Sequence, residues 1–421
     1  MQGIWCNSRY KLILFETKLR LKMSLQIKSF VIFIICLFQM SCSVGQNTSK
    51  QQKFESSNIQ LGNEQFAEYL PLIKQKRVGL IVNHTSLVKN THLVDSLLSL
   101  GIQISKIFAP EHGFRGMADA GETFGNGKDK KTGISIISLY GKHKKPTKED
   151  FEDLDIIIFD IQDVGARFYT YISTLHYVMD ACAENNKKLL VLDRPNPNAH
   201  YVDGPILEPK FKSFVGLDPL PVVYGMTIGE LAKMINGEGW LDNKQKCDLT
   251  VINCKNYQHS SQFSPNSKPS PNLPNYQSMI LYPSICFFEG TNISVGRGTD
   301  MQFQVIGGTD KSYGKFSFTP VDKPGANNPP NEGLVCYGED LRNVNVPRNE
   351  LNLSYLFNFY KNCPDKSTFF LNTNHFNLLA GNETFKQMLI EGKSESEIRT
   401  SWKKDLDAFK TIRSKYLIYA E

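Results

Sequence analysis

The 421-residue chain lacks an apolar run long enough to cross a membrane, and it lacks a strong excess of charge of one sign. Its apolar run Phe30–Phe38 is far shorter than the roughly 20 residues that a membrane-spanning helix needs. The net charge of +6 comes largely from residues 1–45, which hold six basic residues and one acidic residue and leave 42 basic and 41 acidic residues elsewhere. This balance gives no reason to expect a nucleic-acid partner or adsorption to a membrane surface.

The run Phe30–Phe38 is typical of a secretory signal instead, because lysines precede it and small residues follow it. We therefore expect residues 1–45 to be a signal peptide with an N-terminal extension, and residues 46–57 to be a polar tether. Two forms of processing remain open. Cleavage after Gly45 would give a periplasmic protein, whereas lipidation of Cys42 would give a membrane-anchored lipoprotein. Either way the sequence predicts an exported bacterial protein.

The six cysteines that follow Cys42 have no spacing typical of a disulfide or zinc framework. There is no C-x-x-C, and Cys247 and Cys254 form the one close pair, so most of the six are expected to be buried thiols. The sequence also has no G-x-G-x-x-G, H-E-x-x-H or G-x-S-x-G. Gly121–Lys128 departs from a phosphate-binding loop in its spacing and in the residue that follows, Asp129. We therefore predict a site without cofactor or metal.

From about residue 58, apolar strands alternate with amphipathic helices. The run Asp155–Phe159 is almost wholly apolar, as expected for a strand that is covered on both faces. This alternation predicts an α/β fold with a Rossmann-like, doubly wound parallel sheet. The predicted strands are 78–82, 104–108, 134–139, 155–159 and 188–192, and the predicted helices are 91–100, 148–154 and 171–185.

The pattern changes after residue 200. Thr227–Gly237 is a predicted helix that opens with a capping box. Residues 259–275 are rich in Ser, Pro and Asn and are predicted to form a linker or a long loop. We therefore expect a catalytic domain over residues 58–262 and a smaller α+β auxiliary domain over residues 263–421. The other predicted elements are strands 250–252 and 301–307 and helices 349–360, 382–391 and 395–411.

Polar side chains follow each of the five predicted strands of the first domain. The carboxyl ends of parallel strands meet at one edge of a sheet, and ligands bind at that edge. The segments that follow the strands are 83–85, 111–112, 140–143, 160–169 and 193–197. These five segments are therefore expected to line one crevice.

Glu111 is the strongest candidate for a catalytic acid in this crevice. It lies on a turn bounded by Pro and Gly, and the neighbouring Phe108 and Phe114 provide apolar surroundings that favour the neutral, proton-donating form of a carboxyl group. Glycoside cleavage needs such an acid to protonate the leaving oxygen, and usually a second carboxylate. A salt bridge to Arg115 is the structural alternative. The candidates for the second carboxylate are Asp163, Asp160, Glu122 and Glu289.

Cationic and aromatic side chains on the same loops suit a carboxylate and a sugar ring, respectively. Glu289 and Arg297 come from glycine-flanked segments of the second domain and are expected to close over the crevice from its far side. The predicted substrate-binding residues are Asn83, His112, Arg115, Glu122, Tyr140, Arg167, Tyr169, Tyr171, Asp193, Arg194, Asn196, Glu289 and Arg297.

Six motifs of the chain resemble the NamZ family of exo-β-N-acetylmuramidases, and the likeness covers nearly all of the chain from about residue 58. The resemblance implies a Rossmann-like domain that bears the cleft and a smaller C-terminal domain. It also implies removal of N-acetylmuramic acid from the non-reducing end of peptidoglycan fragments, with Glu111 in the position of the family's catalytic Glu. The lactyl carboxylate of that sugar would need a cationic partner, for which Arg167 and Arg115 are candidates. The motifs are residues 79–83, 110–116, 159–171, 192–197, 288–292 and 296–299.

The sequence thus predicts an exported, metal-free glycoside hydrolase that acts on muramyl saccharides. Glu111 would be the general acid/base, and Asp163 or Asp160 would assist it. Two alternatives remain open. One is a metal-dependent hydrolase that uses Asp160, Asp163 and Asp193 as ligands. The other is a cell-wall-sugar-binding protein without catalysis.

Overall fold

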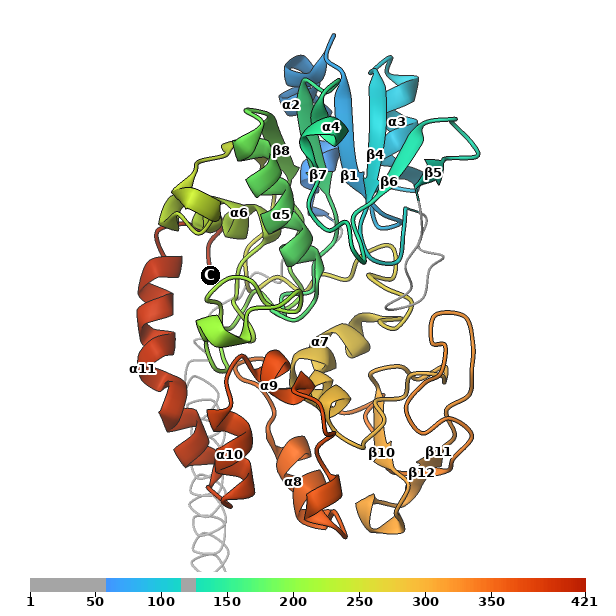
Figure 1. Ribbon diagram of the computed structural model, residues 1–421, viewed down its shortest axis with the longest axis vertical. Coiled ribbons are helices and arrows are strands. Elements are labelled where there is room, and N and C mark those ends of the chain that lie inside the picture. Colours follow the sequence, from blue (N-terminus) through green and yellow to red (C-terminus); the bar gives the residue numbers. More distant parts are fainter. Residues whose placement is uncertain (1–57, 115–125) are drawn as a thin grey trace, which may run out of the picture. The chain divides into compact units, whose positions relative to one another are not determined.

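The computed structural model describes residues 58–114 and 126–421. The large sheet consists of β1 (Val78–Val82), β4 (Ile104–Ala109), β5 (Gly127–Lys128), β6 (Ser135–Ser138), β7 (Ile156–Asp160), β8 (Lys188–Leu192) and β9 (Asp248–Ile252). Its strand order is β5-β6-β4-β1-β7-β8-β9. Strand β5 runs antiparallel to β6, and the other pairs in this sheet are parallel. The predicted Rossmann-like, doubly wound sheet is confirmed (Figure 1).

The strand order reverses direction at β1. The chain first moves outward from β1 to β4 and β6, and the later strands β7, β8 and β9 then extend the sheet on the other side of β1. In open α/β sheets this reversal leaves a crevice at the carboxyl ends of the strands, where ligands bind. The loops that follow β1, β4 and β7 therefore converge on that crevice.

Alternate strand residues face two apolar layers. Leu80 and Ile158 pack in the layer that contains residues of α2 and α3. Ile81 and Ile157 pack in the layer that contains residues of α5 and α6. Burial of each such side chain stabilises the fold by about 1.5–3 kcal/mol. The helices of this domain are α2 (Phe66–Ile73), α3 (Leu93–Ser99), α4 (Lys148–Phe151), α5 (Tyr171–Glu184) and α6 (Ile228–Glu238).

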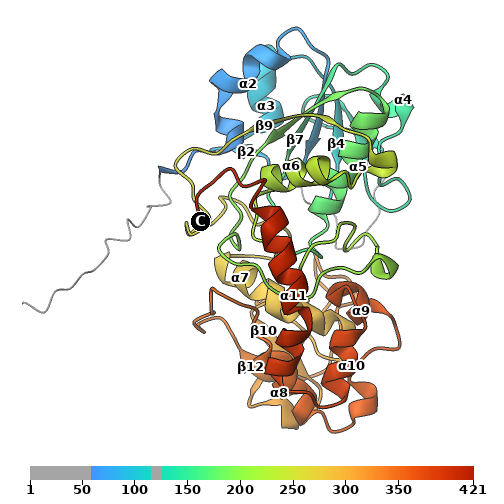
Figure 2. The same cartoon turned by 90° about the vertical axis from the view of Figure 1, so that its left-hand side faces the viewer.

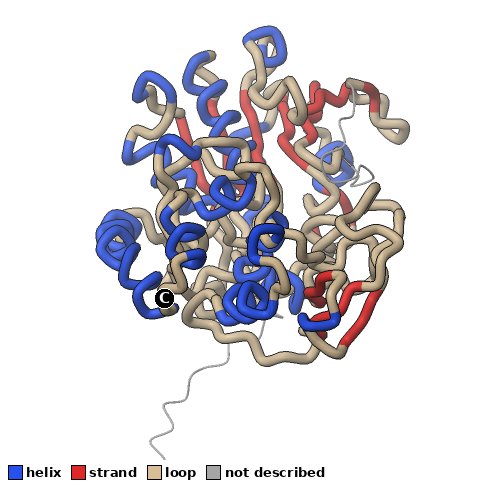
Figure 3. The backbone as a smooth tube through the Cα atoms, turned by 60° about the horizontal axis from the view of Figure 1, so that its bottom comes forward, coloured by secondary structure: helices blue, strands red, loops and turns tan. Residues whose placement is uncertain are grey.

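The C-terminal domain is smaller and mixed, as predicted. Its antiparallel sheet has the order β10-β12-β11, formed by β10 (Val305–Gly308), β11 (Phe316–Phe318) and β12 (Cys336–Asp340). Figure 3 shows the strands of the two sheets as separate groups. The helices of this domain are α7 (Tyr276–Ile285), α8 (Ser354–Asn362), α9 (His375–Ala380), α10 (Thr384–Ile390) and α11 (Glu395–Arg413).

The predicted helix 91–100 begins later than the sequence suggests. Thr91 and His92 form the short strand β3, which pairs with β2 (Leu87–Val88). The helix α3 starts at the next residue, and the Nδ1 atom of His92 accepts a hydrogen bond from the backbone N–H of Val94 at 3.2 Å. The imidazole thus satisfies one of the free N–H groups of the first helical turn.

The sequence pattern predicts neither α2 nor α7. Both helices contain a proline, Pro71 in α2 and Pro283 in α7, and proline normally ends a helix. Residues 259–275 contain no helix or strand, as predicted. This loop nevertheless packs onto the large sheet, because the Nε2 atom of His84 lies 2.7 Å from the carbonyl oxygen of Lys268.

The last helix, α11, contacts both domains (Figures 1 and 2). Near its start, the ring of Trp402 meets that of Phe385 edge-on, with centroids 5.5 Å apart. At its end, Arg413 donates hydrogen bonds of 2.8 and 2.6 Å to the carbonyl oxygen of Gly225. The C-terminal tail thereby returns to the domain that contains the large sheet.

The six cysteines from Cys182 onward are buried and free, which confirms the predicted thiols. Within residues 58–114 and 126–421, no helix combines the length and the apolar character that a membrane span requires. The predicted signal peptide, Cys42 and the polar tether lie outside the described residues.

Candidate active site

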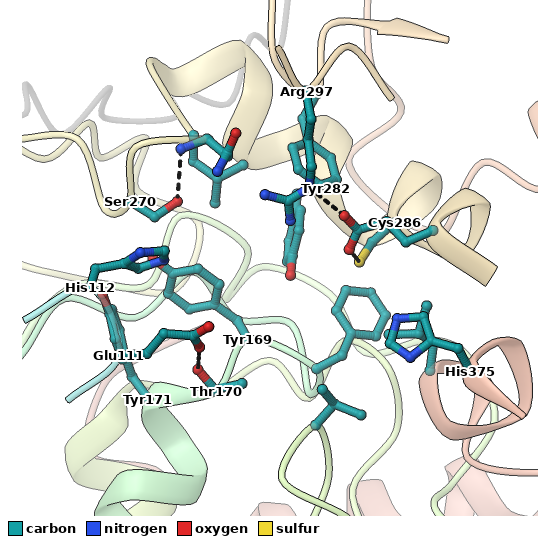
Figure 4. A pocket seen from close by; sticks show the side chains of 17 residues that line it. Glu111, His112, Tyr169, Thr170, Tyr171, Ser270, Tyr282, Cys286, Arg297 and His375 are labelled. Carbon is teal, nitrogen blue, oxygen red and sulfur yellow. Dashed lines mark hydrogen bonds and ion pairs between the residues drawn. The ribbon is translucent and has the colours of Figure 1, made fainter. Parts of the chain in front are cut away.

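A cavity of about 130 Å³ lies where the loops after β4 and β7 meet the C-terminal domain, and we call it the Glu111 cavity (Figure 4). It combines two carboxylates with histidine, arginine and aromatic side chains. Its lining consists of Glu111, His112, Phe168, Tyr169, Thr170, Tyr171, Val215, Ser270, Asn272, Leu273, Tyr282, Cys286, Glu289, Arg297, Phe303, His375 and Leu379.

The hydroxyl group of Thr170 holds the carboxyl group of Glu111. Its Oγ1 atom donates a hydrogen bond of 2.6 Å to Oε2 of Glu111 (Figure 4). Burial, and secondarily the charge of Glu111, raises the pKa of the phenol of Tyr140. The hydrogen bond from Thr170 restricts the rotation of the carboxyl group and so limits the directions in which it can donate a proton.

The backbone beside Glu111 has an uncommon conformation. His112 has φ +67° and Gly113 has φ +75°, and the N–H of Gly113 donates a hydrogen bond of 2.9 Å to the carbonyl oxygen of Pro110. A positive φ is unfavourable for a residue with a side chain such as His112. The tight turn therefore places Glu111 and His112 directly after β4, with both side chains lining the cavity.

Aromatic rings form one wall of the cavity. The ring centroids of Tyr169 and Tyr171 lie 4.9 Å apart, and Tyr282 lies 5.8 Å from Tyr169 and 4.9 Å from Phe303, all edge-on. Burial raises the pKa of the phenol of Tyr171, and the charge of Glu111 raises it further. Rings in such an arrangement offer a rigid apolar surface to a sugar.

An ion pair from the C-terminal domain lies across the cavity from Glu111 (Figure 4). The Nε atom of Arg297 donates a hydrogen bond of 2.5 Å to Oε1 of Glu289. The guanidinium also lies 5.1 Å from the ring centre of Phe303, and Sγ of Cys286 lies 3.5 Å from Oε2 of Glu289. Both predicted residues of this segment therefore line the cavity, as partners of each other.

Asn83 lies behind the lining. Its Oδ1 atom accepts hydrogen bonds from the N–H of Thr85 at 2.9 Å and from Oγ1 of Thr85 at 2.6 Å. Asn83 also lowers the pKa of Tyr171, against the larger effect of burial. Asn83 therefore lies close to a residue that lines the cavity without lining it itself.

Asp163 is buried and does not line the cavity. Its Oδ2 atom accepts hydrogen bonds from the N–H of Gly165 at 2.7 Å and from the hydroxyl of Tyr224. Burial raises the pKa of Asp163 to about 6, against the opposing effect of these hydrogen bonds. The charge of Asp163 acts on the lining residues Tyr169 and Tyr171, so the structure places it behind the aromatic wall.

Asp160 forms a buried ion pair with Arg194. The Nε and Nη2 atoms of Arg194 donate hydrogen bonds of 2.6 and 3.0 Å to the two carboxylate oxygens, and Asn63 donates a further bond of 3.0 Å. Neither member of the pair lines the Glu111 cavity; Arg194 lines a separate cavity of about 370 Å³.

Asp193 is buried among four donors. Its Oδ1 atom accepts from the N–H groups of Arg194 and Gly229, and its Oδ2 atom accepts from the hydroxyls of Thr227 and Tyr419 at 2.8 and 2.6 Å. Burial and, secondarily, the charge of Glu230 raise the pKa of Asp193 to about 6. Asp193 therefore joins the C-terminal tail to the sheet.

Asn196 is likewise buried away from the cavity lining. Its Nδ2 atom donates a hydrogen bond of 2.8 Å to the carbonyl oxygen of Met226. A Cβ atom at Gly165 would lie 2.2 Å from Oδ1 of Asn196. The amide therefore packs against the loop after β7, which accounts for the glycine there.

The guanidinium of Arg167 is committed to backbone carbonyls. Its side chain is 0% exposed. Nη1 donates to the carbonyl oxygens of Pro205 and Leu220 at 2.8 and 2.6 Å, and Nη2 donates to that of Leu379 at 2.8 Å. Burial lowers the pKa of Arg167 to about 9, so it stays cationic at neutral pH. It links the loop after β7 to α9.

Comparison with known proteins places this arrangement in a family. The family model "Exo-beta-N-acetylmuramidase NamZ, N-terminal" matches residues 78–277, and the model "Exo-beta-N-acetylmuramidase NamZ, C-terminal" matches residues 280–419. The chain belongs to the NamZ family. Each of the two matched regions contributes lining residues to the Glu111 cavity, for example Glu111 and Thr170 from the first and Arg297 from the second.

Individual relatives agree with this assignment. The chain is 39% identical over 401 residues to the peptidoglycan β-N-acetylmuramidase NamZ of Bacillus subtilis. This match covers 88% of this chain and 94% of that protein. Two crystal structures of DUF1343 family proteins from Bacteroides fragilis have the same fold. One is 46% identical with a TM-score of 0.80, the other 30% identical with a TM-score of 0.73, and each match covers 86% of this chain and 99% of the other.

The predicted metal ligands of the alternative hydrolase each have other partners within the protein. Asp160 pairs with Arg194, Asp163 with Tyr224, and Asp193 with the tail. Across residues 58–114 and 126–421, no group of three or more His, Cys, Asp or Glu side chains is arranged to hold a metal ion. The predicted binding residues Arg115 and Glu122 lie outside the described residues.

Sequence reasoning missed much of the lining in this NamZ-family chain. Thr170 lies within the motif of residues 159–171, so its position was within reach. The loop 259–275 also supplies lining residues, but its composition is typical of a linker. The lining residues on α7 and α9 belong to no recognisable motif. The residues missed are Thr170, Val215, Ser270, Asn272, Leu273, Tyr282, Cys286, Phe303, His375, Leu379 and Phe168.

Proposed function

We propose that this protein is an exo-acting glycoside hydrolase that releases N-acetylmuramic acid from the non-reducing end of peptidoglycan fragments. The observation that carries the proposal is the position of Glu111. It lies in a cavity at the switch-point edge of the sheet, in a chain whose two regions both match NamZ family models. The 39% identity to a peptidoglycan β-N-acetylmuramidase supports the substrate class.

In this proposal Glu111 is the general acid/base. The hydrogen bond from Thr170 restrains the orientation of its carboxyl group, which suits proton transfer to the leaving glycosidic oxygen. The rings of Tyr169 and Tyr171 offer a surface for the sugar. Bound sugar would exclude water from a cavity of this size and strengthen the interactions with the developing charge.

Asp163 and Asp160 take supporting parts in the proposal. Asp163 lies behind Tyr169 and Tyr171 and acts on them through its charge, so it positions the aromatic wall. Asp160 is neutralised by Arg194 and fixes the end of β7. Neither carboxylate lines the cavity. In this proposal the group that assists Glu111 directly is therefore one of the side chains that line it.

Turnover of a defined disaccharide tests the proposal. The chain from Gln46 onward is incubated with N-acetylmuramic acid linked β-1,4 to N-acetylglucosamine, and free N-acetylmuramic acid is measured. We expect release by the wild type and loss of at least about 10²-fold in kcat for Glu111→Gln, in keeping with the contribution of a general acid. Glu332→Gln, which changes an exposed glutamate away from the cavity, is the matched control and should keep full activity.

The other outcomes separate the alternatives. Release that disappears with EDTA and returns with Mg²⁺ or Zn²⁺ would favour the metal-dependent hydrolase. Binding of the disaccharide by both wild type and Glu111→Gln, without turnover by either, would favour a sugar-binding protein. Equal turnover by wild type and Glu111→Gln would remove Glu111 from the mechanism.

We also propose that the protein is exported, because peptidoglycan fragments are met outside the cytoplasm and residues 1–45 have the pattern of a signal. The mass of the mature N-terminus tests this. Cleavage after Gly45 and a lipid on Cys42 give different masses, and a full-length chain in a native cell extract would contradict export.

A further inference from the structure

Arg297 is a cation that lines the Glu111 cavity and has N–H donors without a partner among the described residues. Its side chain is 21% exposed. Its Nε atom is bound to Glu289, whereas its Nη1 and Nη2 atoms have no hydrogen-bond partner among the residues that the structure describes. Figure 4 shows the guanidinium reaching into the cavity from the side opposite Glu111. A half-buried guanidinium with a free edge is suited to a planar anion.

The backbone holds Arg297 in place. Gly296 has φ +80° and Gly298 has φ +79°, a conformation that side chains rarely adopt. A Cβ atom at Gly298 would lie 2.6 Å from both Cγ of Pro329 and the carbonyl oxygen of Val321. Arg297 therefore stands between two fixed glycines, and little conformational freedom remains for it to lose when a ligand binds.

Glu289 fixes the guanidinium from one edge. Because its Oε1 atom takes the Nε–H, the edge formed by the two Nη atoms stays free. The ring of Phe303 packs on the guanidinium at 5.1 Å and restricts it further. The ion pair also cancels the net charge, so an anion gains little from long-range attraction and must meet the free Nη edge to bind. Such a site selects by geometry as well as by charge.

The proposed substrate carries one group that matches this edge. N-acetylmuramic acid differs from N-acetylglucosamine by a lactyl ether on O3, which ends in a carboxylate. Of the two sequence candidates for this partner, Arg115 lies outside the described residues. The Nη atoms of Arg167, the other candidate, donate to three carbonyl oxygens, and its side chain is 0% exposed. We propose that Arg297, held by Glu289, binds the lactyl carboxylate and is the residue by which the cavity distinguishes muramic acid from glucosamine. This inference rests on the proposed function.

Three substrates and two variants test the assignment. The substrates are the p-nitrophenyl β-glycosides of N-acetylmuramic acid, of its lactyl amide and of N-acetylglucosamine. For the wild type we expect kcat/KM to be roughly 10- to 100-fold lower on the amide than on the acid, the effect of losing a charge-assisted hydrogen-bond pair. For Arg297→Gln we expect kcat/KM on the acid to fall by a similar factor relative to the wild type, mainly through a higher KM. This variant should cleave the acid and the amide with equal kcat/KM.

Two variants serve as checks. Arg297→Lys keeps the positive charge but lacks the paired N–H donors of the guanidinium, so it should recover part of the preference for the acid. Arg342→Gln is the matched control, because Arg342 also pairs through Nε with a carboxylate, that of Asp340, and lies 6.0 Å from the ring of Phe316, yet does not line the cavity. It should discriminate like the wild type.

Failure of the inference and failure of the proposed function give different results. A wild type that cleaves none of the three glycosides contradicts the proposed function. A wild type that cleaves acid and amide equally well contradicts the role of Arg297 while the function stands, and so does an Arg297→Gln variant that still prefers the acid. If Arg297→Gln does not fold, the wild-type comparison of acid with amide and the Arg297→Lys variant still decide.

Discussion

Replacement of Arg167 by methionine separates a structural from a ligand-binding role for this residue. The side chain is fully buried and binds three carbonyl oxygens, those of Pro205, Leu220 and Leu379. Methionine keeps an unbranched chain of similar reach but removes every donor. The substitution therefore leaves the apolar packing largely in place and takes away the polar link between the loop after β7 and α9.

The expected loss of stability follows from the three carbonyl groups. Leu220 keeps a second donor, the N–H of Leu207 at 3.0 Å, whereas Pro205 and Leu379 lose the one donor that the described residues give them. Each buried carbonyl left without a partner costs about 1–3 kcal/mol. Removal of a buried charge returns part of that cost, so we expect Arg167→Met to lower the free energy of unfolding by about 2–4 kcal/mol. If both domains unfold together, this loss lowers the Tm of the whole chain by about 3–5 °C.

Thermal unfolding and steady-state kinetics on the same preparation give the answer. We expect the Tm to fall while KM for the muramyl disaccharide stays within about twofold of wild type, because uniform binding of substrate is unchanged. An unchanged Tm together with a KM raised about 100-fold would refute the reasoning and return Arg167 to the cavity as a carboxylate ligand. Arg342→Met, at an exposed ion pair, is the control and should change the Tm little.

Two further predictions concern Thr170, which lines the cavity, and Asp193, which joins the C-terminal tail to the sheet. Thr170→Val should lower kcat about tenfold, because Glu111 loses its hydroxyl donor, and Thr170→Ser should restore it; equal kcat for all three proteins would contradict the role of Thr170. Asp193→Asn should flatten the dependence of stability on pH. Since burial raises the pKa of Asp193 from 3.8 to about 6, its contribution to stability is complete below pH 3.8 and is lost as the pH rises through about 6. Urea unfolding between pH 4 and 7 should therefore show about 2.4 kcal/mol less variation in the variant, and a curve parallel to the wild type would contradict this.

The sequence predicted the large sheet well because its strands are long, apolar and covered on both faces. Runs such as Ile156–Asp160 leave little doubt about strand or helix once flanking turns are considered. The C-terminal domain was harder. Its strand β11 has three residues, and α7 contains Pro283 near its end, so neither periodicity nor propensity identifies them.

The candidate site was predicted in part, and for a physical reason. Glu111, His112 and the aromatic pair Tyr169 and Tyr171 follow strand ends, and the topology of a parallel sheet alone brings them together. Residues from the other side of the cavity depend on how the second domain packs. His375, for example, comes from α9, and nothing in the local sequence indicates that it lines the same cavity as Glu111.

The polar residues predicted to bind substrate divide into two kinds, and the hydrogen-bonding groups that they leave free in the cavity tell them apart. The edge of the sheet that binds a ligand is also the edge on which the second domain and the tail dock, so both tasks call for charged groups at the same sequence positions. Asp193 takes part in docking, because its carboxylate accepts a hydrogen bond from Tyr419 of the tail. Arg167 also takes part in docking, because its guanidinium donates a hydrogen bond to Leu379. Arg297 instead keeps one edge of its guanidinium unspent inside the cavity. A donor that is paired within the protein, or that is buried outside the cavity as the Nε atom of Arg167 is, has nothing to offer a substrate. A donor left unpaired in a cavity costs stability that a ligand can return. On this argument Arg297 stands apart from Arg167 and Asp193, although all three belong to the binding residues predicted from the sequence.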